Sequence, residues 1–213
     1  MTSATKRTNH GVVKAEVTQL AILRSAEALF AERGVDAVSL REVAAHAGQR
    51  NHSAVLYHFG DKRDLLEALL SRHSDPVDAA FPAQIAALQA QGGESLENLV
   101  RVLVTPLAAK LDDADGGPQY LQICAELSFS KSYPLPSLRA ANGPGASELM
   151  QRLGPYLRMK DSRLIPLRML RTASVLFGSL AAFQRLRESG LDLPREAFDE
   201  DLVQSLVALF SAP

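Results

Sequence analysis

SLREVAAHAGQRNHSAVLYHFGDKRDLL, residues 39–66, is the stretch that decides how the first third of this 213-residue chain folds. Ser39, with Glu42 three residues later, is typical of a capping box, in which each side chain accepts a free backbone N–H of the first helical turn. Gly48 indicates that this helix ends after barely two turns, because glycine is favoured just after a helix C-cap. The stretch therefore begins with one short, sharply bounded helix.

A second short helix is expected after a polar turn. Val55 and Phe59, four residues apart, predict its buried face, and Gly60 predicts its end. The polar run 49–53 opens this helix, so its first turn can be exposed while the other face packs on the preceding helices. Two short helices joined by such a turn predict a helix-turn-helix, which places the start of its second helix in the DNA major groove.

Helices are also expected on both sides of this pair. Residues 16–33 carry apolar side chains at the spacing of one helical face, and Gly34 marks the end of that helix. Asp61 is expected to cap a longer, leucine-rich helix that begins near Lys62 and runs to Ser74 or beyond. The segment before the helix-turn-helix and the segment after it thus complete a small helical module.

The polar side chains of the helix-turn-helix are the candidates for contact with DNA. Arginine suits the O6 and N7 edge of guanine, and asparagine suits the N6 and N7 edge of adenine, so Arg50 and Asn51 are candidate base contacts. Hydroxyl, imidazole and ammonium groups around them suit phosphate. The predicted DNA-binding residues are Ser39, Arg41, Arg50, Asn51, His52, Ser53, Tyr57, His58 and Lys62. For Tyr57, a partly buried place in the core remains the alternative.

Together with ILRSAEALFAERG at residues 22–34, the opening stretch resembles the DNA-binding module of the tetracycline-repressor (TetR) family. The resemblance covers roughly residues 14–75, and it is specific because the matching residues agree in order, spacing and type: Ala47-Gly48, Tyr57-His58-Phe59, Lys62 and Leu65-Leu66. It implies an all-helical bacterial regulator with a three-helix N-terminal module and a larger C-terminal domain. That domain dimerises and binds a small effector in this family.

The turn departs from the commonest family pattern. Nine residues stand between Ala47-Gly48 and His58-Phe59, where eight are usual, and Gln49-Arg50-Asn51 replaces the usual Val-Ser. Leu56 stands where many relatives have a second tyrosine, so only Tyr57 is carried over as a phosphate contact. The extra residue changes which side chains open the second helix, and the base contacts depend on it.

The chain is expected to be all-α and to divide into three parts. Residues 1–14 are interpreted as a loose basic arm, either a frayed terminus or a contact to DNA. Residues 15–75 form the helix-turn-helix domain, and residues 76–213 form a Leu/Ala-rich helical domain for effector binding and dimerisation. In that last part, Pro82 and five later clusters of glycine or proline predict breaks between helices. No segment alternates apolar and polar residues for long enough to predict a strand.

An effector pocket is expected between about residues 81 and 159. Aromatic and sulfur-containing side chains there could line an apolar cavity with a few hydroxyl groups, as ligand sites often do. The candidates are Phe81, Tyr120, Cys124, Phe129, Tyr133, Met150 and Tyr156, with Met159 as a further one. Most of these side chains would alternatively form only core. Glu126 is expected to be exposed or paired with an arginine.

The last two helices are expected to join two copies of the chain. The resemblance implies a dimer built on a four-helix interface, which holds two DNA-reading modules about one DNA turn apart. Ser174, Gly178 and Ala182 form a row of small residues that allows close helix approach. The alternative is that these faces complete the core of one subunit. The predicted interface residues are Met169, Ser174, Leu176, Gly178, Leu180, Ala182, Phe183, Phe198, Leu202, Leu206 and Leu209.

Composition limits the remaining possibilities. The chain is 46% hydrophobic and 22% charged, which is ordinary for a globular protein, and its formal net charge is −1. A slight excess of basic residues lies in the first third and a slight acidic excess in the rest. The one cysteine, Cys124, fits a reducing, cytoplasmic environment. No membrane segment is expected, since Arg185 and Arg187 closely follow the longest apolar run. No metal and no cofactor are expected, because no cluster has the spacing of ligands.

The leading hypothesis is a DNA-binding transcriptional regulator, a repressor released from a pseudo-palindromic operator by an unidentified small molecule. One alternative is a helical ligand-binding or interaction protein that does not bind an operator. The other is an enzyme, for which the sequence offers no nucleophile elbow, no phosphate-binding glycine loop and no metal cluster.

Overall fold

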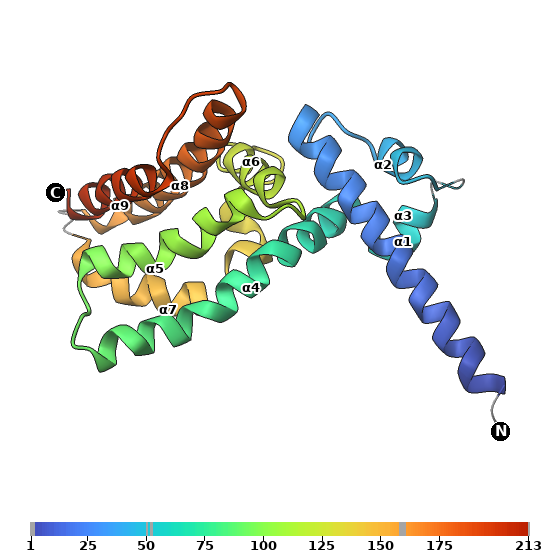
Figure 1. Ribbon diagram of the computed structural model, residues 1–213, viewed down its shortest axis with the longest axis horizontal. Helices are drawn as coiled ribbons and strands as arrows, with labels where there is room; N and C mark the ends of the chain where they lie inside the picture. The colour runs from blue at the N-terminus through green and yellow to red at the C-terminus, as the bar shows by residue number, and fades with distance from the viewer. Residues whose placement is uncertain (1–2, 50, 52, 158–160, 213) are drawn as a thin grey trace. The chain divides into compact units, whose positions relative to one another are not determined.

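The structure is a computed structural model that describes residues 3–49, 51, 53–157 and 161–212, and for residues 3–14 it describes the backbone alone (Figure 1). The described residues form helices and no strand, which confirms the all-α prediction. The chain divides into two compact units, Met1–Leu69 and Leu70–Pro213. The division falls inside one helix, slightly before the expected boundary at residue 75.

The first unit holds the three predicted helices and the start of a fourth. Apolar side chains from each of them, among them Phe30, Val43, Val55 and Leu65, are fully buried in a shared core. The predicted apolar faces are therefore confirmed for these side chains, whereas Phe59 of the second short helix is only partly buried. The helices of this unit are α1 (Ser3–Arg33), α2 (Leu40–His46), α3 (Ser53–Phe59) and the first turns of α4 (Lys62–Ala90).

Helix α1 begins earlier than expected. Its backbone is helical from Ser3, so the interpretation of residues 1–14 as a loose arm is wrong for residues 3–14. Helix growth adds one hydrogen bond for each residue ordered once a nucleus exists, and the strongly packed turns after Glu16 provide that nucleus. No proline interrupts the segment, and the single Gly11 costs only about 1 kcal/mol relative to alanine.

Helix α4 continues through two prolines. Pro82 was expected to break it, yet α4 includes both Pro76 and Pro82 and ends only at Ala90. Each internal proline costs about 3 kcal/mol or more, because a backbone hydrogen bond is lost. Both prolines are exposed, whereas Val77 and Phe81 on the opposite face are buried. Burial of that face holds the helix through both positions.

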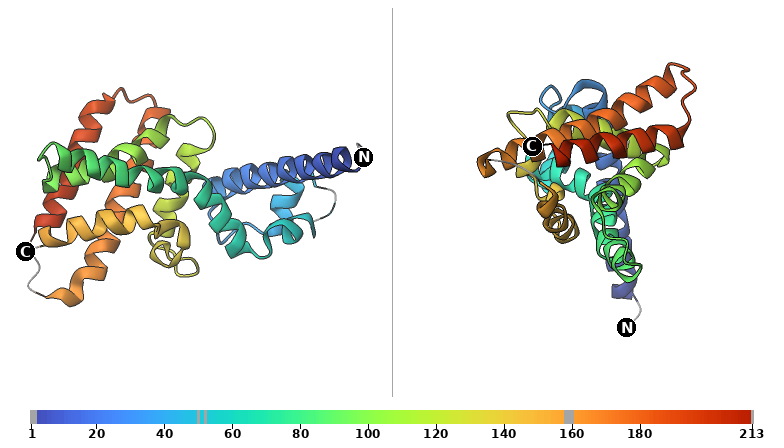
Figure 2. Two further views of the ribbon diagram at one scale, coloured as in Figure 1. Left: turned by 90° about the horizontal axis from the view of Figure 1, so that it is seen from below. Right: turned by 90° about the vertical axis from the view of Figure 1, so that its left-hand side faces the viewer.

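The second unit is a bundle around α5, α6, α8 and α9. Helix α6 packs on α8, and α5 packs on α9. Helices α8 and α9 lie side by side, as the right-hand view of Figure 2 shows. The five later predicted breaks all fall between α-helices or at the first residues of one. The helices are α5 (Leu96–Ala108), α6 (Gly117–Leu127), α7 (Pro144–Leu153), α8 (Ile165–Glu188) and α9 (Arg195–Ser211).

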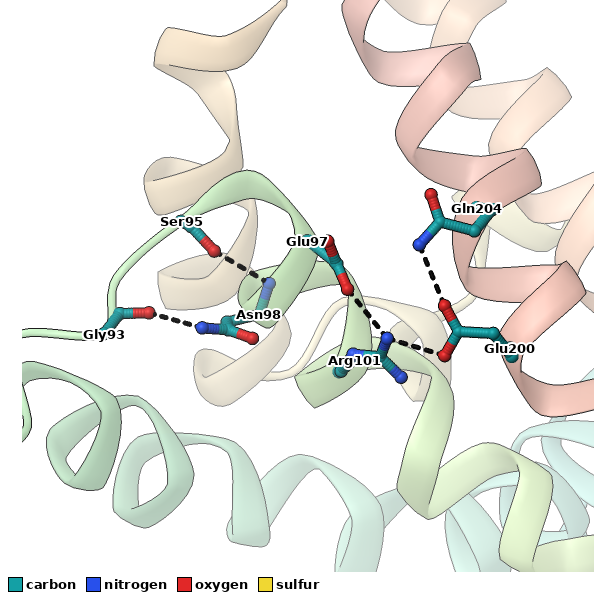
Figure 3. A network of polar contacts seen from close by, with 7 residues as sticks. All are labelled: Gly93, Ser95, Glu97, Asn98, Arg101, Glu200 and Gln204. Atoms are coloured by element: carbon teal, nitrogen blue, oxygen red, sulfur yellow. Dashed lines mark hydrogen bonds and ion pairs between the residues drawn. The ribbon is translucent and has the colours of Figure 1, made fainter. Parts of the chain in front are cut away.

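A polar network joins the exposed sides of α5 and α9 (Figure 3). The Arg101 guanidinium donates to Glu97 at 2.7 Å and to Glu200 at 2.6 Å, and Gln204 donates to the other Glu200 oxygen at 2.9 Å. Hydrogen bonds from Gln204 and Arg101 lower the pKa of Glu200. Exposed ion pairs contribute little stability, so burial of apolar side chains of α9, such as Leu202 and Leu206, does more to hold this helix in the unit.

Helix α7 is fastened to α4 by one carboxylate. Asp78 accepts the backbone N–H of Gly145 at 3.1 Å and that of Ala146 at 2.7 Å, at the N-terminus of α7. These bonds satisfy donors that have no partner inside the helix. Gly145 allows the close approach, because a Cβ there would lie 2.1 Å from the Asp78 carbonyl oxygen. Helix α7 also lies beside α5 (Figure 1).

One segment of the described chain, Ser162–Glu188, is long and apolar enough to cross a membrane by length and composition alone. The sequence pattern predicts no such segment. Its apolar side chains divide between two faces: Leu176 and Leu180 are buried within the unit, whereas Leu167 and Val175 are exposed. Packing on α6 and α9 accounts for the first face.

Replacing Gly145 by alanine is expected to destabilise the second unit by about 1–3 kcal/mol, because the added methyl group must displace the α4 backbone. Thermal or urea unfolding measures this loss. The matched control is Gly154→Ala, whose Cβ meets nothing within 4 Å. It should leave stability unchanged or raise it by up to about 1 kcal/mol. Equal stability of the two variants would contradict the close contact between α7 and α4.

Candidate nucleic-acid interface and effector cavity

The predicted capping box is present at the start of α2. Ser39 Oγ accepts from Glu42 N at 3.3 Å, and the Ser39 backbone N–H and hydroxyl each donate to Glu42 Oε2 at 2.8 Å. Arg33 at the end of α1 donates to the other carboxylate oxygen at 2.8 Å. These hydrogen bonds lower the pKa of Glu42 to about 2. Glu42 therefore joins the end of α1 to the start of α2. Ser39, a predicted DNA contact, donates its hydroxyl hydrogen to Glu42.

The turn after α2 has the geometry of a Schellman motif. Gly48 adopts φ +68°, and its N–H donates to Ala45 O, while Gln49 N donates to Ala44 O. Asn51 Oδ1 then accepts from Ser53 N at 2.9 Å, so the predicted adenine reader helps to begin α3. The predicted contacts Arg50 and His52 lie outside the described residues.

One face of α3 is exposed. Tyr57 is 85% exposed, which rules out the alternative that it is a core tyrosine. Its ring meets that of His58 edge-on, with centroids 5.1 Å apart. Ser53, one turn earlier, is exposed, as is half of the Leu56 side chain. Val55 is fully buried and anchors the opposite face. The described part of α3 thus presents hydroxyl, imidazole and apolar groups to solvent.

The start of α4 is held by a second reciprocal cap. Asp64 N donates to Asp61 Oδ1 at 2.9 Å, which confirms Asp61 as the predicted cap. The ammonium of Lys62 donates to Asp36 O at 3.2 Å and lies 5.9 Å from the centroid of the Phe30 ring. Lys62 therefore secures the loop after α1, a role that sequence reasoning missed. Arg41 of α2 is exposed.

The second unit contains a cavity of about 290 Å³. Its walls come from α4, α5, α6, α7, α8 and the segment before α7, and most lining side chains are aliphatic or aromatic. Phe81, Tyr120, Cys124 and Met150 line it, so four of the predicted pocket residues lie together. Such a mostly apolar lining with few polar groups is typical of small-molecule sites.

The other predicted pocket residues lie elsewhere. Phe129 is 73% exposed beyond the end of α6, so its assignment to the pocket is wrong. Tyr133 and Tyr156 do not line the cavity, and Met159 lies outside the described residues. Residue type alone misled here, because Phe129, Tyr133 and Tyr156 all follow the end of an α-helix, outside the helices that form the cavity walls. Glu126 is exposed, in agreement with the prediction.

Sequence reasoning missed the polar lining of the cavity. Ser74 and Asp78 come from α4, Thr172 from α8, and Asn142 from the segment before α7. Ser74, Val77, Asp78 and Phe81 follow a three- and four-residue spacing along one helical face. That spacing was the signal for this wall, but the expected helix end near residue 74 concealed it.

Burial makes the cavity cysteine unreactive. Loss of solvent raises the pKa of the Cys124 thiol to about 12, against a smaller opposing effect of the Tyr120 hydroxyl. Burial also raises the pKa of Tyr120. Both groups are therefore neutral at physiological pH. A protonated thiol is a poor nucleophile, so Cys124 acts as a small apolar lining group.

The predicted dimer residues fall into two sets. Five of them, Leu176, Leu180, Phe183, Leu202 and Leu206, are buried in the subunit's own core. Their assignment to an interface is corrected, because apolar stripes at this spacing serve internal packing of α8 and α9 equally well. Partly exposed are Met169, Ser174, Gly178, Ala182, Phe198 and Leu209.

Comparison with known proteins places the first unit in a family. Residues 22–69 match the family model for bacterial regulatory proteins of the tetR family. These residues form a TetR-family module. The repressor BepR of Brucella suis is 39% identical over 77 residues, covering 36% of this chain and 34% of its own length. An HTH-type transcriptional repressor of Mycobacterium tuberculosis is 47% identical over 55 residues, covering 26% and 29%.

These sequence matches span about a third of the curated relatives' length. Solved structures extend the likeness in fold to nearly the whole chain. A TetR family transcription regulator from Marinobacter aquaeolei matches with a TM-score of 0.62 at 18% identity, covering 92% of this chain and 96% of that one. A mutant HlyIIR protein matches with 0.51 at 16% identity, covering 93% and 99%.

Metal-ligand chemistry is not evident in the part of the chain that the structure describes. No group of three or more His, Cys, Asp or Glu side chains there could hold a metal ion.

Acid is expected to weaken the TetR module through Glu42. The folded-state pKa of about 2 lies below the ordinary value of 4.5. The stabilisation by the ionised carboxylate is therefore present above about pH 4.5, and it is lost as the pH falls towards 2. The loss of stability in Glu42→Gln should accordingly be clear at pH 6 and shrink towards pH 2. Thermal unfolding measures it, with the exposed Glu32→Gln as control; a deficit independent of pH would contradict this role.

Proposed function

We propose that this chain is a DNA-binding transcriptional regulator that represses through its TetR module and is released from DNA by a small molecule. The exposed face of α3, on a helix anchored by buried Val55, is the observation that carries this proposal. A recognition helix must be fixed on one side and free on the other, and α3 has this division. The family model of this module describes bacterial regulatory proteins, and the two curated relatives named above are transcriptional repressors.

We assign contact with DNA to exposed side chains of the module that do not cap a helix. Tyr57 and Arg41 are exposed and suit phosphate oxygens. Ser39 and Asn51 serve mainly as caps, so they are assigned supporting roles. Arg50 and His52 stay predicted contacts of the turn. The target is double-stranded DNA with a pseudo-palindromic sequence, since a symmetric dimer reads two half-sites.

The cavity of the second unit is proposed as the effector site. Helix α4 supplies one wall, with Ser74, Asp78 and Phe81, and the same helix begins in the TetR module at Lys62. A ligand that alters the course of α4 would change the placement of the module and lower affinity for the operator. The cavity and the DNA-binding face would then be two separate sites coupled through one shared helix, α4, as allostery requires.

A homodimer is proposed through the exposed face of α8. Leu164, Leu167, Val175 and Leu186 are exposed large apolar side chains on this segment, and Gly178 lies between them with open space at its Cβ position. Three- and four-residue steps place them on one helical face. Small residues at its centre allow a partner helix to approach closely. We assign the interface to this exposed face, in place of the five predicted interface residues that are buried in the subunit's own core.

The two other functions have less support. A helical ligand-binding protein without an operator would use the same cavity, but it would not need the exposed α3 face. An enzyme would need an activated nucleophile or a perturbed acid or base, and burial of Cys124 protects its thiol instead of activating it. We therefore propose that the chain is not an enzyme. A mobility-shift assay with the DNA upstream of its own gene separates regulator from binding protein.

Removing the Tyr57 hydroxyl is expected to weaken operator binding. A hydrogen bond to a charged group contributes about 1.5–3 kcal/mol, so Tyr57→Phe should reduce affinity by about tenfold to a hundredfold. Mobility shifts at several salt concentrations measure this loss. Tyr156→Phe, in the second unit, is the matched control and should bind like the parent chain. Equal affinities for both variants would count against a phosphate contact.

Tryptophan at Gly178 is expected to prevent assembly, because its bulk would separate the two α8 helices. A Cβ at Gly178 meets nothing within 4 Å, so the subunit itself should tolerate the change. Light scattering should then give the mass of one chain. Gly154→Trp is the control, since its Cβ is equally open and lies outside the α8 face. A dimer that persists in Gly178→Trp would disprove this interface.

A further inference from the structure

The cavity lining has an unusual charge balance for a site that must recognise a ligand. No Lys, Arg or His is among the described residues that line it, and Asp78 is its one ionisable carboxylate. Arg168, although buried on α8 next to the lining Met169, donates instead to Leu209 O and Ala212 O. An anionic ligand would therefore lose its hydration without gaining a cationic partner, which is costly in an apolar site.

The single carboxylate is already engaged. Both Asp78 oxygens accept backbone N–H groups at the N-terminus of α7, one at 3.1 Å and the other at 2.7 Å. Helix N-termini favour negative charge, so these donors already compensate much of the carboxylate's charge. A cationic ligand would have to compete with them. The lining thus strongly disfavours an anionic ligand. A cationic ligand would have to share the Asp78 carboxylate with the backbone N–H groups of α7.

One buried side-chain oxygen of the lining has no hydrogen-bond partner in the part of the chain that the structure describes. Ser74 is 9% exposed, and its Oγ has no hydrogen-bond partner among the described residues. Other hydroxyls of the lining are satisfied: Thr172 Oγ1 donates to Arg168 O at 2.9 Å, and the Tyr120 hydroxyl bonds to Cys124. A buried hydroxyl without a partner is unfavourable. Ser74 is therefore the position at which a bound molecule gains a hydrogen bond.

We propose that the cavity selects a neutral, predominantly apolar molecule whose one hydroxyl or carbonyl group pairs with the Ser74 hydroxyl. This inference rests on the proposed effector site and names the chemical class of its ligand. The volume of about 290 Å³ lies at the lower end of small-molecule sites, so the ligand is compact. Aromatic walls from Phe81, Tyr120 and Phe177 favour a flat ring system.

Four probes that share one ring system test this selection: β-naphthylmethanol, β-methylnaphthalene, β-naphthoate and β-naphthylmethylammonium. The chain contains no Trp, so naphthyl fluorescence can be titrated with little background from the protein. The alcohol should bind most tightly, about threefold to tenfold better than the methyl compound, which lacks only the hydroxyl. The carboxylate and the ammonium should bind at least tenfold more weakly than the methyl compound.

Three variants locate the effect. Ser74→Ala should remove the advantage of the alcohol over the methyl compound. Ser128→Ala should keep it, because Ser128 is equally buried but already donates to Cys124 O at 2.9 Å. Ala173→Phe, which fills the cavity from α8, should weaken all four probes. Thermal unfolding of each variant checks that the chain is folded.

The outcomes separate this inference from the proposed function. The inference is overturned if either charged probe binds as well as the alcohol, if the alcohol keeps its advantage in Ser74→Ala, or if no probe binds. None of these titrations contains DNA. A chain that shows the expected preference but fails to shift its own upstream DNA would overturn the regulator proposal alone.

Discussion

Burial of one apolar face of α4 is the interaction on which both compact units depend. Leu65, Leu66 and Leu69 complete the core of the first unit, and Val77 and Phe81 continue the same face in the second. Their burial outweighs two internal prolines, which would end a solvated helix. Because of this, the helix that closes the TetR module also supplies a wall of the cavity.

The exposed face of α3 depends on local hydrogen bonds. Seven residues are too few for a stable isolated helix, so α3 needs fixed ends and a buried anchor. Gly48 reverses the chain before it, and Gly60 ends it in a conformation that other residues rarely adopt. The ionised Glu42, bonded to Ser39 and Arg33, holds α2 against α1. These bonds leave Tyr57 free for a partner.

The proposed ligand specificity of the cavity depends on the Ser74 hydroxyl, a buried group without a hydrogen-bond partner among the described residues. Asp78, Thr172 and Tyr120 all bring polar atoms to its wall, and each of these is already bonded within the unit. What distinguishes Ser74 is the absence of such a bond in the described structure. In an apolar lining, one hydroxyl of this kind discriminates between ligands more sharply than the surrounding area does.

Local signals were sufficient to predict the module, whereas the cavity and the outer face of α8 required the tertiary structure. Ser39 with Glu42, Gly48 and Asp61 act within a few residues of themselves, so their spacing already determines the caps. By contrast, an apolar stripe such as Leu176 with Leu180 does not reveal whether it meets its own subunit or another. Whether Ser74 is bonded likewise depends on residues distant in sequence. The packing of the helices determines what the apolar stripe meets and whether Ser74 has a partner, because burial is a property of the whole unit.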